Sequence, residues 1–361
     1  MMTVRTLTAR LGDFGGLVDW DRVQSWIDAH PEIPGSGPIV EVARIDGGSQ
    51  NNLFLITRGE DKLVMRRPPK HQRANSNDTM LREARLLNAL RGTGVPHADL
   101  YAVCDDISII GATFYLMRPL SGFAPGGSKA LPGLYGSEQS WRYALGEELV
   151  RAAVTLEAVD HIAAGLADYG NPDHWHARQA DRWRSQLESY RSIPGYEGPD
   201  ALPNVDFIGR WLSDNVPKDG RIGIIHGDYQ FPNVMFSLEK PEIAGLIDWE
   251  LSTLGDPLLD LGWMLTCWWE PGDPKQPNIQ PWEGFMTRRE LVMLYGELSG
   301  RDMSAAPWFF ALACYKLGCI LEGSYARSKA GYTTYETGQR TRNYAVYLFT
   351  KAMQIIKTER I

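Results

Sequence analysis

The loop HGDYQFPN, residues 226–233, constrains the fold more than any other segment of the chain. It joins two short apolar runs that predict strands, and a third run of this kind, IAGLI, ends at Asp248. Loops that follow buried strands often carry the groups that bind ligands. We therefore expect Asp228, Asn233 and Asp248 to face one cleft.

These three residues suit metal-assisted proton transfer. Asp228 can accept the proton of an attacking hydroxyl, and the side-chain oxygen of Asn233 can bind a metal ion. Asp248 adds a second oxygen ligand of the kind that Mg²⁺ prefers, with water and phosphate oxygens completing the shell. Each residue alone could be an ordinary turn former, but the combination favours a catalytic site.

The same segment resembles a known family. HGDYQFPN and the following IDWELSTLGDPLLDLGW are similar to the catalytic and metal motifs of the aminoglycoside phosphotransferase-like kinases, which have the protein-kinase-like fold and phosphorylate small molecules. The resemblance implies that Asp228 is the catalytic base and that Asn233 and Asp248 hold Mg²⁺. It also implies ATP as the phosphoryl donor and a hydroxyl of a small molecule as the acceptor.

Three further residues of these motifs are expected to support the loop. By resemblance, His226 braces the loop, and Asp256 and Asp260 are structural acids. A second interpretation of Asp256 is a cap for the next helix, with Pro257 at the first helical position.

The expected architecture is a bilobal α+β fold of the protein-kinase-like kind. We expect a small β-rich lobe over residues 1–120 and a larger helical lobe over residues 121–361. In the first lobe, the patterns predict a helix over 18–29, strands over 39–45, 53–57, 62–66, 100–104 and 113–117, and a helix capped by Asn77 or Asp78 that runs to Arg91. In the second lobe, they predict helices near 141–165, 178–191, 205–215, 288–299 and 306–328, another from Pro257, and strands over 222–226, 234–236 and 243–248.

The kinase resemblance places an ATP clamp in the first lobe. Arg66 ends the run KLVMR, where kinases usually carry a lysine that contacts the phosphates, and arginine keeps the charge. Glu83 lies on the apolar face of the predicted helix that ends at Arg91. A carboxylate there needs a buried cation, and Arg66 is the natural partner. A glutamate that reaches the surface is the alternative.

Two more segments take their roles from the resemblance. Gly47, Gly48 and Ser49 lie between the first two strands, where kinases carry the phosphate-covering loop. The GxGxxG spacing is absent, and an ordinary hairpin is the alternative. The segment FYLMRPLSG resembles the hinge between the lobes, whose backbone groups contact adenine. The expected contacts there are Met117, Arg118 and Leu120.

Within this fold, the chain is similar to the subgroup that is fused to acyl-CoA dehydrogenases in some animals. The similar stretches are GGSQNNLFLI, LVMRRPP, REARLLNAL, GATFYLMRPLSG, AVDHIAAGLADYG and RQADRWRSQ. This resemblance implies a hydroxyacyl-CoA acceptor. An aminoglycoside or other antibiotic kinase is one alternative, and a nucleotide-binding scaffold without catalysis is another. Glu322, Tyr325 and Arg327 are candidates for the acceptor site, which C-terminal helices build in this family.

A basic stretch over residues 62–73 is consistent with a substrate that carries phosphates. It holds five lysine and arginine side chains and no acid. Such a cluster suits the phosphates of ATP or of coenzyme A. We favour the alternative, a solvated basic loop plus Arg66.

The charge balance argues against two classes of partner. The chain has 37 basic and 44 acidic side chains, and its first 120 residues hold 14 of each, so the net charge of −7 belongs to the remainder. We expect neither a nucleic acid nor an anionic membrane as a partner. We also expect no membrane helix, because no run of about 18 apolar residues stands out. The oligomeric state is left open.

Cysteine, histidine and tryptophan patterns add little chemistry. The four cysteines form no CxxC pair, which predicts reduced thiols in a cytoplasmic protein. His174 and His176 lack a third ligand and predict no metal site. Core packing or a pocket wall explains the cluster of Trp263, Trp268 and Trp269 as well as substrate stacking does.

Overall fold

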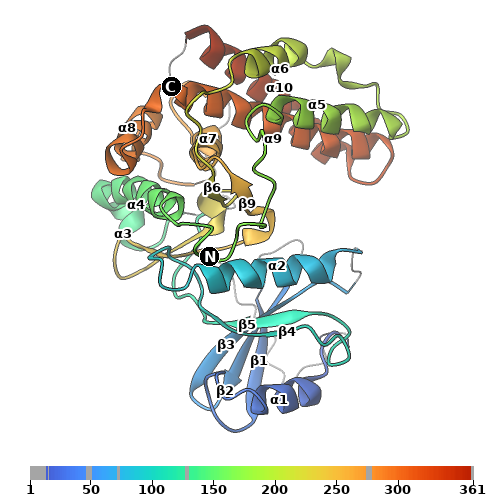
Figure 1. Cartoon of the computed structure of the whole chain (residues 1–361), viewed down its shortest axis with the longest axis vertical. Coiled ribbons are helices and arrows are strands. Elements are labelled where there is room, and N and C mark those ends of the chain that lie inside the picture. The colour runs from blue at the N-terminus through green and yellow to red at the C-terminus, as the bar shows by residue number, and fades with distance from the viewer. Residues whose placement is uncertain are drawn as a thin grey trace.

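The computed structural model describes residue 14 and residues 16–45, 51–70, 74–126, 130–273 and 279–358. A small part built on a β-sheet is followed by a larger, mainly helical part (Figure 1). The predicted bilobal α+β architecture is confirmed.

A five-stranded antiparallel sheet forms the first part, in the order β1-β2-β3-β5-β4. Its strands are β1 (Ile39–Ile45), β2 (Asn52–Arg58), β3 (Asp61–Arg67), β4 (Leu100–Cys104) and β5 (Phe114–Met117). Because β3 lies between β2 and β5, Arg66 near its end pairs with Leu53 on one side and Tyr115 on the other. This position places the Arg66 side chain in the middle of the sheet.

The helices α1 (Trp20–Asp28) and α2 (Ser76–Ala89) pack into different cores. Trp20, Val23 and Ile27 of α1 bury against the sheet in a small separate core. The apolar face of α2 instead joins the large core of the helical part. In Figure 1, α2 lies between the sheet and the helical part, so it is the element through which the two parts pack.

The start of α2 differs from its prediction. Its N-cap is Asn75, not Asn77 or Asp78. The side-chain oxygen of Asn77 instead accepts the backbone N–H of Thr113, 3.0 Å away, at the start of the β5 region. Because that amide belongs to a distant segment, local sequence carried no signal for the contact.

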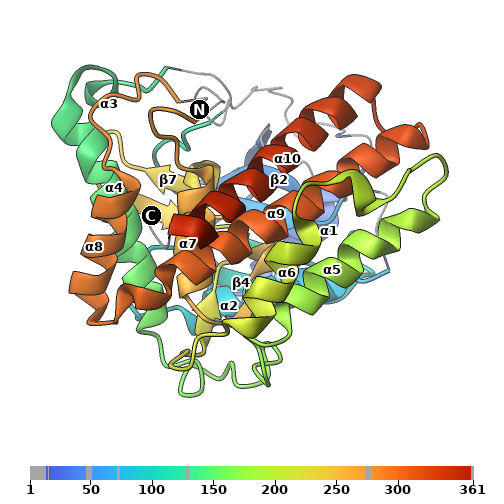
Figure 2. The same cartoon turned by 90° about the horizontal axis from the view of Figure 1, so that it is seen from above.

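Eight α-helices are assigned within the described residues after the first sheet: α3 (Leu134–Ser137), α4 (Gln139–Glu157), α5 (Gln179–Ser189), α6 (Val205–Asp214), α7 (Leu258–Cys267), α8 (Arg288–Ser299), α9 (Ala306–Lys329) and α10 (Tyr335–Thr358). Figure 2 shows α9 and α10 lying side by side, with α7, α5 and α6 also around α9. The predicted helix over 141–165 is too long. The chain turns at Asp160, whose carboxylate accepts the N–H groups of Ile162 and Ala163.

Two small antiparallel ribbons join the parts of the helical region. One pairs β6 (Gly223–Ile225) with β9 (Thr253–Gly255), and the other pairs β7 (Val234–Phe236) with β8 (Ile243–Leu246). The sequence patterns predicted β6, β7 and β8 but neither β9 nor the short α3. The N–H of Leu246 in β8 donates to the carbonyl of Pro96, which ties this ribbon to the segment before β4.

One stretch of the described residues, Met303–Lys329, passes a length and composition test for crossing a membrane, with a mean hydropathy of 1.4. The stretch is not an uninterrupted apolar run, because it contains Lys316 and Glu322, and the expectation of no membrane helix stays a prediction. The fold explains the apolar character, because 67% of the apolar 18-residue segment within this stretch is buried. The stretch includes α9, the helix at the centre of the second part.

Candidate active site

The loop from His226 to Asn233 follows β6 and is held by backbone contacts. The carboxylate of Asp260, on α7, accepts the N–H of His226 at 2.6 Å and the N–H of Gly227 at 2.9 Å. Gly227 has a φ of +84°, and a Cβ there would lie 2.4 Å from the carbonyl oxygen of Leu251. Only glycine fits this turn. Asp260 therefore acts as the structural acid that the motif implied.

The carboxylate of Asp228 is fixed by three donors. Its Oδ1 accepts hydrogen bonds from Gln230 Nε2 at 2.6 Å and from Trp263 Nε1 at 2.8 Å. Its Oδ2 accepts one from Asn233 Nδ2 at 2.7 Å. The side chain thus sits half-buried in a defined orientation.

Asn233 and Asp248 are brought together through the backbone. The N–H of Ile247, next to Asp248, donates to the carbonyl of Asn233 at 2.9 Å. The ring of His226 contacts the carbonyl of Ile247 at 3.0 Å, so His226 connects the loop to the end of β8. Asn233 also uses its side-chain N–H groups on Asp228, which leaves its amide oxygen for another partner.

Asp248 adopts an unusual backbone conformation. Its φ is +67°, in the left-handed region that residues other than glycine rarely occupy. Such conformations persist where the surrounding structure enforces them and concentrate at functional sites. The Asp248 side chain is 41% exposed and reaches the space between the two parts, where Arg66 meets it.

Arg66 connects the sheet, α2 and the segment that carries Asp248. Its Nε lies 3.1 Å from Glu83 Oε2, and its Nη2 donates to Asp248 Oδ1 at 3.1 Å. Burial raises the pKa of Glu83 more than Arg66 lowers it, and a hydrogen bond from Tyr115 opposes the rise. Burial also lowers the pKa of Arg66, but Glu83 and Asp248 outweigh it and raise that pKa overall.

A buried lysine lies behind the catalytic loop. Lys316, on α9, donates from Nζ to the carbonyl of Gly227 at 3.0 Å and lies 4.2 Å from the ring centre of Trp263. Burial lowers the pKa of Lys316 to about 8, although Asp260 and Asp228 oppose that shift. The cation is therefore held against the loop that carries the candidate base.

Sequence reasoning missed several of these residues. Lys316 and Gln230 were not singled out, and Trp263 was assigned to core packing or a pocket wall. A signal existed for Trp263, because it follows Asp260 by three residues and so shares its helix face. Another existed for Lys316, a lone cation in the apolar run ALACYKLGCIL.

The structure describes only some of the residues that were predicted to contact the nucleotide in the first part. Gly47, Gly48 and Ser49 lie outside the described residues. The backbone N–H of Arg118 donates to the carbonyl of Asp99 at 2.9 Å, and its side-chain Nε pairs with the Asp99 carboxylate. The adenine contacts expected of Met117, Arg118 and Leu120 stay predictions.

Asp256 has a structural role. Its carboxylate accepts the N–H of Leu258, the first residue of α7, but the N-cap of that helix is Pro257, one residue later than the capping interpretation placed it. It also contacts His176 Nε2 at 2.9 Å and pairs with Arg301 at 2.8 Å. His176 is thus occupied within the fold, and the described residues contain no group of three or more acidic, histidine or cysteine side chains placed to hold a metal.

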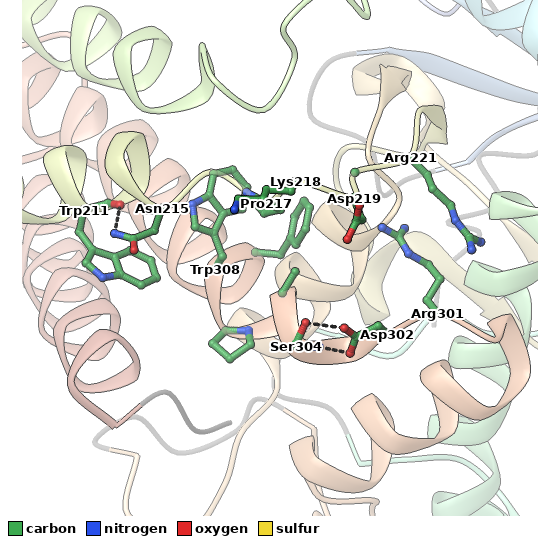
Figure 3. A pocket seen from close by; sticks show the side chains of 14 residues that line it. Trp211, Asn215, Pro217, Lys218, Asp219, Arg221, Arg301, Asp302, Ser304 and Trp308 are labelled. Carbon is green, nitrogen blue, oxygen red and sulfur yellow. Dashed lines mark hydrogen bonds between the residues drawn. The ribbon is translucent and has the colours of Figure 1, made fainter.

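A cavity of about 630 Å³ lies beside Arg301 on the helical part (Figure 3). The loop after α6 and the start of α9 form its walls, which carry Trp211, Lys218, Asp219, Arg221, Asp302 and Trp308. No predicted site residue lines it. It is therefore separate from the site that the sequence motifs indicated.

A second cavity, of about 290 Å³, adjoins the catalytic loop. Gln230, Phe231 and Pro232 of the loop form part of its wall. The rest is mostly aromatic and aliphatic, with Trp268, Trp269, Trp282, Tyr344, Tyr347, Leu317 and Leu321 among the lining residues. Two charged lining residues, Asp273 and Arg288, pair with each other at 2.6 Å. The cavity thus offers mainly apolar surface.

The expected acceptor residues of α9 do not line this cavity. Glu322 is fully buried, accepts the hydroxyl of Tyr196 and pairs with Arg342. Tyr325 and Arg327 are also absent from the wall. Glu322 directly follows Leu321 but lies about 100° further around α9 than that residue, which lines the cavity with Leu317.

The sequence matches the phosphotransferase enzyme family over residues 41–281. It is 28% identical over 312 residues to acyl-CoA dehydrogenase family member 10 of Mus musculus, which covers 85% of this chain and 28% of that protein. It is 27% identical over 346 residues to acyl-CoA dehydrogenase family member 11 of Rattus norvegicus, covering 92% of this chain and 42% of that protein. The chain spans less than half the length of these curated relatives.

Solved structures share the fold. A putative aminoglycoside phosphotransferase from Ralstonia eutropha matches with a TM-score of 0.77 and 29% identity, over 93% of this chain and 98% of that chain. A thermostable mutant of an aminoglycoside phosphotransferase, solved with AMP-PNP and hygromycin B, matches with a TM-score of 0.56 and 12% identity, over 91% of this chain and 97% of that chain. The resemblance that the motifs indicated is confirmed.

Replacing Glu83 should destabilise the fold. Glu83→Ala leaves the buried Arg66 with Asp248 as its remaining carboxylate, and breaking a buried pair costs about 3–5 kcal/mol. Because Asp248 still compensates part of the charge, we expect a loss of about 3 kcal/mol in the free energy of unfolding, measured by urea denaturation. Glu60→Ala, at an exposed turn, is the control and should cost under about 0.5 kcal/mol. Equal losses in the two variants would contradict a buried pair.

Lys316 should make stability depend on pH in the alkaline range. Its pKa in the fold, about 8, lies below its ordinary value of 10.5, so the unfolded chain holds the proton more tightly. The cost of burying the cation is full below pH 8 and disappears as the pH rises to 10.5, a gain of up to about 3 kcal/mol. Lys316→Met should lack this rise in urea titrations, and Lys357→Met, at an exposed position, should keep it. A constant difference between wild type and Lys316→Met at pH 7.5 and pH 10 would contradict the assignment.

Proposed function

Because the chain belongs to the phosphotransferase enzyme family, whose members include small-molecule kinases, we propose that it transfers the γ-phosphoryl group of ATP to a hydroxyl of a small molecule. The observation that carries this proposal is the convergence of Asp228, Asn233 and Asp248 through direct hydrogen bonds and the Ile247 backbone link. ATP as the donor is supported by the AMP-PNP complex of the aminoglycoside phosphotransferase that shares the fold.

Asp228 is assigned as the proton acceptor. A carboxylate held by three donors orients the acceptor hydroxyl and takes its proton as the oxygen forms a bond to the γ-phosphorus. The bond between the γ-phosphorus and the bridging oxygen of ADP breaks in the same in-line displacement, and ADP leaves with the electron pair.

Asn233 and Asp248 are assigned as the residues that would hold Mg²⁺. The amide nitrogen of Asn233 is spent on Asp228, so its oxygen remains as a ligand, and Asp248 presents a partly exposed carboxylate. These hard oxygen donors fit Mg²⁺, which usually takes few protein ligands and completes its shell with water and phosphate. When bound, Mg²⁺ would neutralise charge on the phosphates.

Arg66 is assigned to the phosphates of ATP. Its guanidinium already lies between Glu83 and Asp248, which directs it into the space between the two parts. Of the basic stretch predicted around it, Arg67 is committed to the fold, since it donates to the carbonyls of Pro68 and Leu17. The stretch as a whole is therefore less available for phosphates than its composition indicated.

We assign the aromatic cavity beside the loop to the acceptor substrate. Its lining favours an acceptor that carries an apolar chain. Its charged lining residues pair with each other, and aliphatic and aromatic side chains cover the rest. Such a surface suits the acyl chain of a hydroxyacyl-CoA better than a polycationic aminoglycoside. The names of the relatives, acyl-CoA dehydrogenase family members, point in the same direction.

The alternatives differ in what the site must do. An antibiotic kinase would need carboxylates directed at a cationic substrate, and a non-catalytic scaffold would need no proton acceptor next to the metal residues. The fixed carboxylate of Asp228 favours catalysis.

All four cysteines are free thiols, which supports a reducing compartment such as the cytoplasm.

Variants of the two carboxylates should separate catalysis from nucleotide binding. Asp228→Asn keeps the size of the side chain but removes the proton acceptor, so turnover should fall about 10²–10⁴-fold while the dissociation constant of MgATP stays near that of wild type. Asp248→Ala should weaken MgATP binding as well, because a metal ligand is lost. Phosphoryl transfer and MgATP titration provide the two measurements. Near-normal turnover of Asp228→Asn would remove it from the mechanism, and unchanged MgATP affinity of Asp248→Ala would refute the metal site.

A panel of acceptors should reveal the substrate class. With hydroxyacyl-CoA compounds of increasing chain length, kcat/KM should rise about fourfold per methylene buried in the cavity, from about 0.8 kcal/mol each. Leu321→Ser, in the cavity wall, should flatten this dependence, and Leu298→Ser, at an exposed position of α8, should leave it unchanged. Faster phosphorylation of aminoglycosides than of any hydroxyacyl-CoA would overturn the assignment.

A further inference from the structure

The hydrogen bonds around Asp228 are unevenly shared between its two oxygens. Oδ1 accepts two, from Gln230 and Trp263, and Oδ2 accepts one, from Asn233. An ionised carboxylate offers about two lone-pair positions on each oxygen. Both positions on Oδ1 are therefore filled, and the remaining one lies on Oδ2.

The donor from α7 is held rigidly. Trp263 is 4% exposed and follows Asp260, the residue that anchors the loop backbone, by one helical turn. The ammonium of Lys316 lies over its ring and also binds the carbonyl of Gly227. One helix and one buried cation thus fix both the loop and the indole N–H that meets its carboxylate.

We propose that Trp263 is a positioning residue for phosphoryl transfer, which, together with Gln230, fills Oδ1 of Asp228 and thereby reserves Oδ2 for the proton of the acceptor hydroxyl. The inference rests on the proposed function, since it assigns Asp228 as the proton acceptor. Oδ2 is also the oxygen that contacts Asn233. The proton therefore leaves the acceptor on the side of the carboxylate that adjoins the metal-binding residues, where the phosphoryl group must lie.

The role of Trp263 resides in its N–H, not in its bulk. Lost N–H donation would let the carboxylate rotate between orientations, and only part of that population would present a free oxygen to the acceptor. Phenylalanine keeps most of the apolar surface that packs in the core but lacks the donor. A matched control exists in Trp308, which is also 4% exposed and donates its N–H to the carbonyl of Leu212.

The test compares Trp263→Phe with Trp308→Phe in the full chain. ADP formation from MgATP, with water as the acceptor, gives the turnover, and titration with MgATP gives the affinity. We expect Trp263→Phe to lower kcat about tenfold, the value of one hydrogen bond to a charged group, with MgATP affinity unchanged. Trp308→Phe should stay within about twofold of wild type in both measurements.

A double-mutant cycle distinguishes positioning from a general loss of structure. In the Asp228→Asn background, Trp263→Phe should cause no further decrease, because the proton acceptor it orients is already gone. A tenfold decrease in that background, or equal effects of Trp263→Phe and Trp308→Phe, would overturn the inference. Wild-type protein that forms no ADP, either with water or with any compound of the acceptor panel, would instead refute the proposed function.

Gln230→Met provides a second route if Trp263→Phe does not fold. It removes the other donor to Oδ1 from a half-buried loop position outside the α7 core. We expect a decrease in kcat that again vanishes in the Asp228→Asn background. A decrease that persists there would also contradict the inference.

Discussion

The ion pairs that Arg66 forms with Glu83 and with Asp248 are the interaction on which the packing of the two parts of the chain depends. A buried glutamate is unfavourable without a cation, and a buried arginine is unfavourable without a carboxylate. Each of the three elements involved is therefore constrained by the other two. The central strand of the sheet, the helix α2 and the end of β8 meet at one point, and that point is the edge of the candidate active site.

The second part of the chain contributes a rigid support for the catalytic loop. Asp260 and Lys316 each contact the loop backbone, through the N–H groups and the carbonyl of Gly227 respectively. Burying a cation and a carboxylate behind a loop costs stability, since both lose solvation. Their position links the loop to α7 and α9, helices that otherwise serve the core. The site thus depends on helices that local motifs describe only in part.

The motif residues were predictable because their chemistry is local. The strands on either side of the loop are short apolar runs, and glycine at residue 227 is demanded by a turn with positive φ. The Arg66–Glu83 pair was also predictable, because a glutamate on an apolar helix face needs a buried cation. By contrast, the capping assignment of α2 failed, since Asn77 binds an amide 36 residues away that no local pattern reveals. Which face of α9 meets the aromatic cavity was likewise not readable locally, because packing against α7 and α10 sets it.

The sequence by itself indicated the family, through the resemblance of its motifs, and the α+β class, through apolar patterns along the chain; it also grouped Asp228, Asn233 and Asp248, because they stand at strand ends within a short segment. Only the tertiary structure decided what surrounds them. Trp263 and Lys316 lie 35 and 88 residues from Asp228, and their contacts arise because α7 and α9 pack against the loop. Hydrogen bonds and burial between distant segments depend on how the helices pack, and packing is a property of the whole chain rather than of any local pattern.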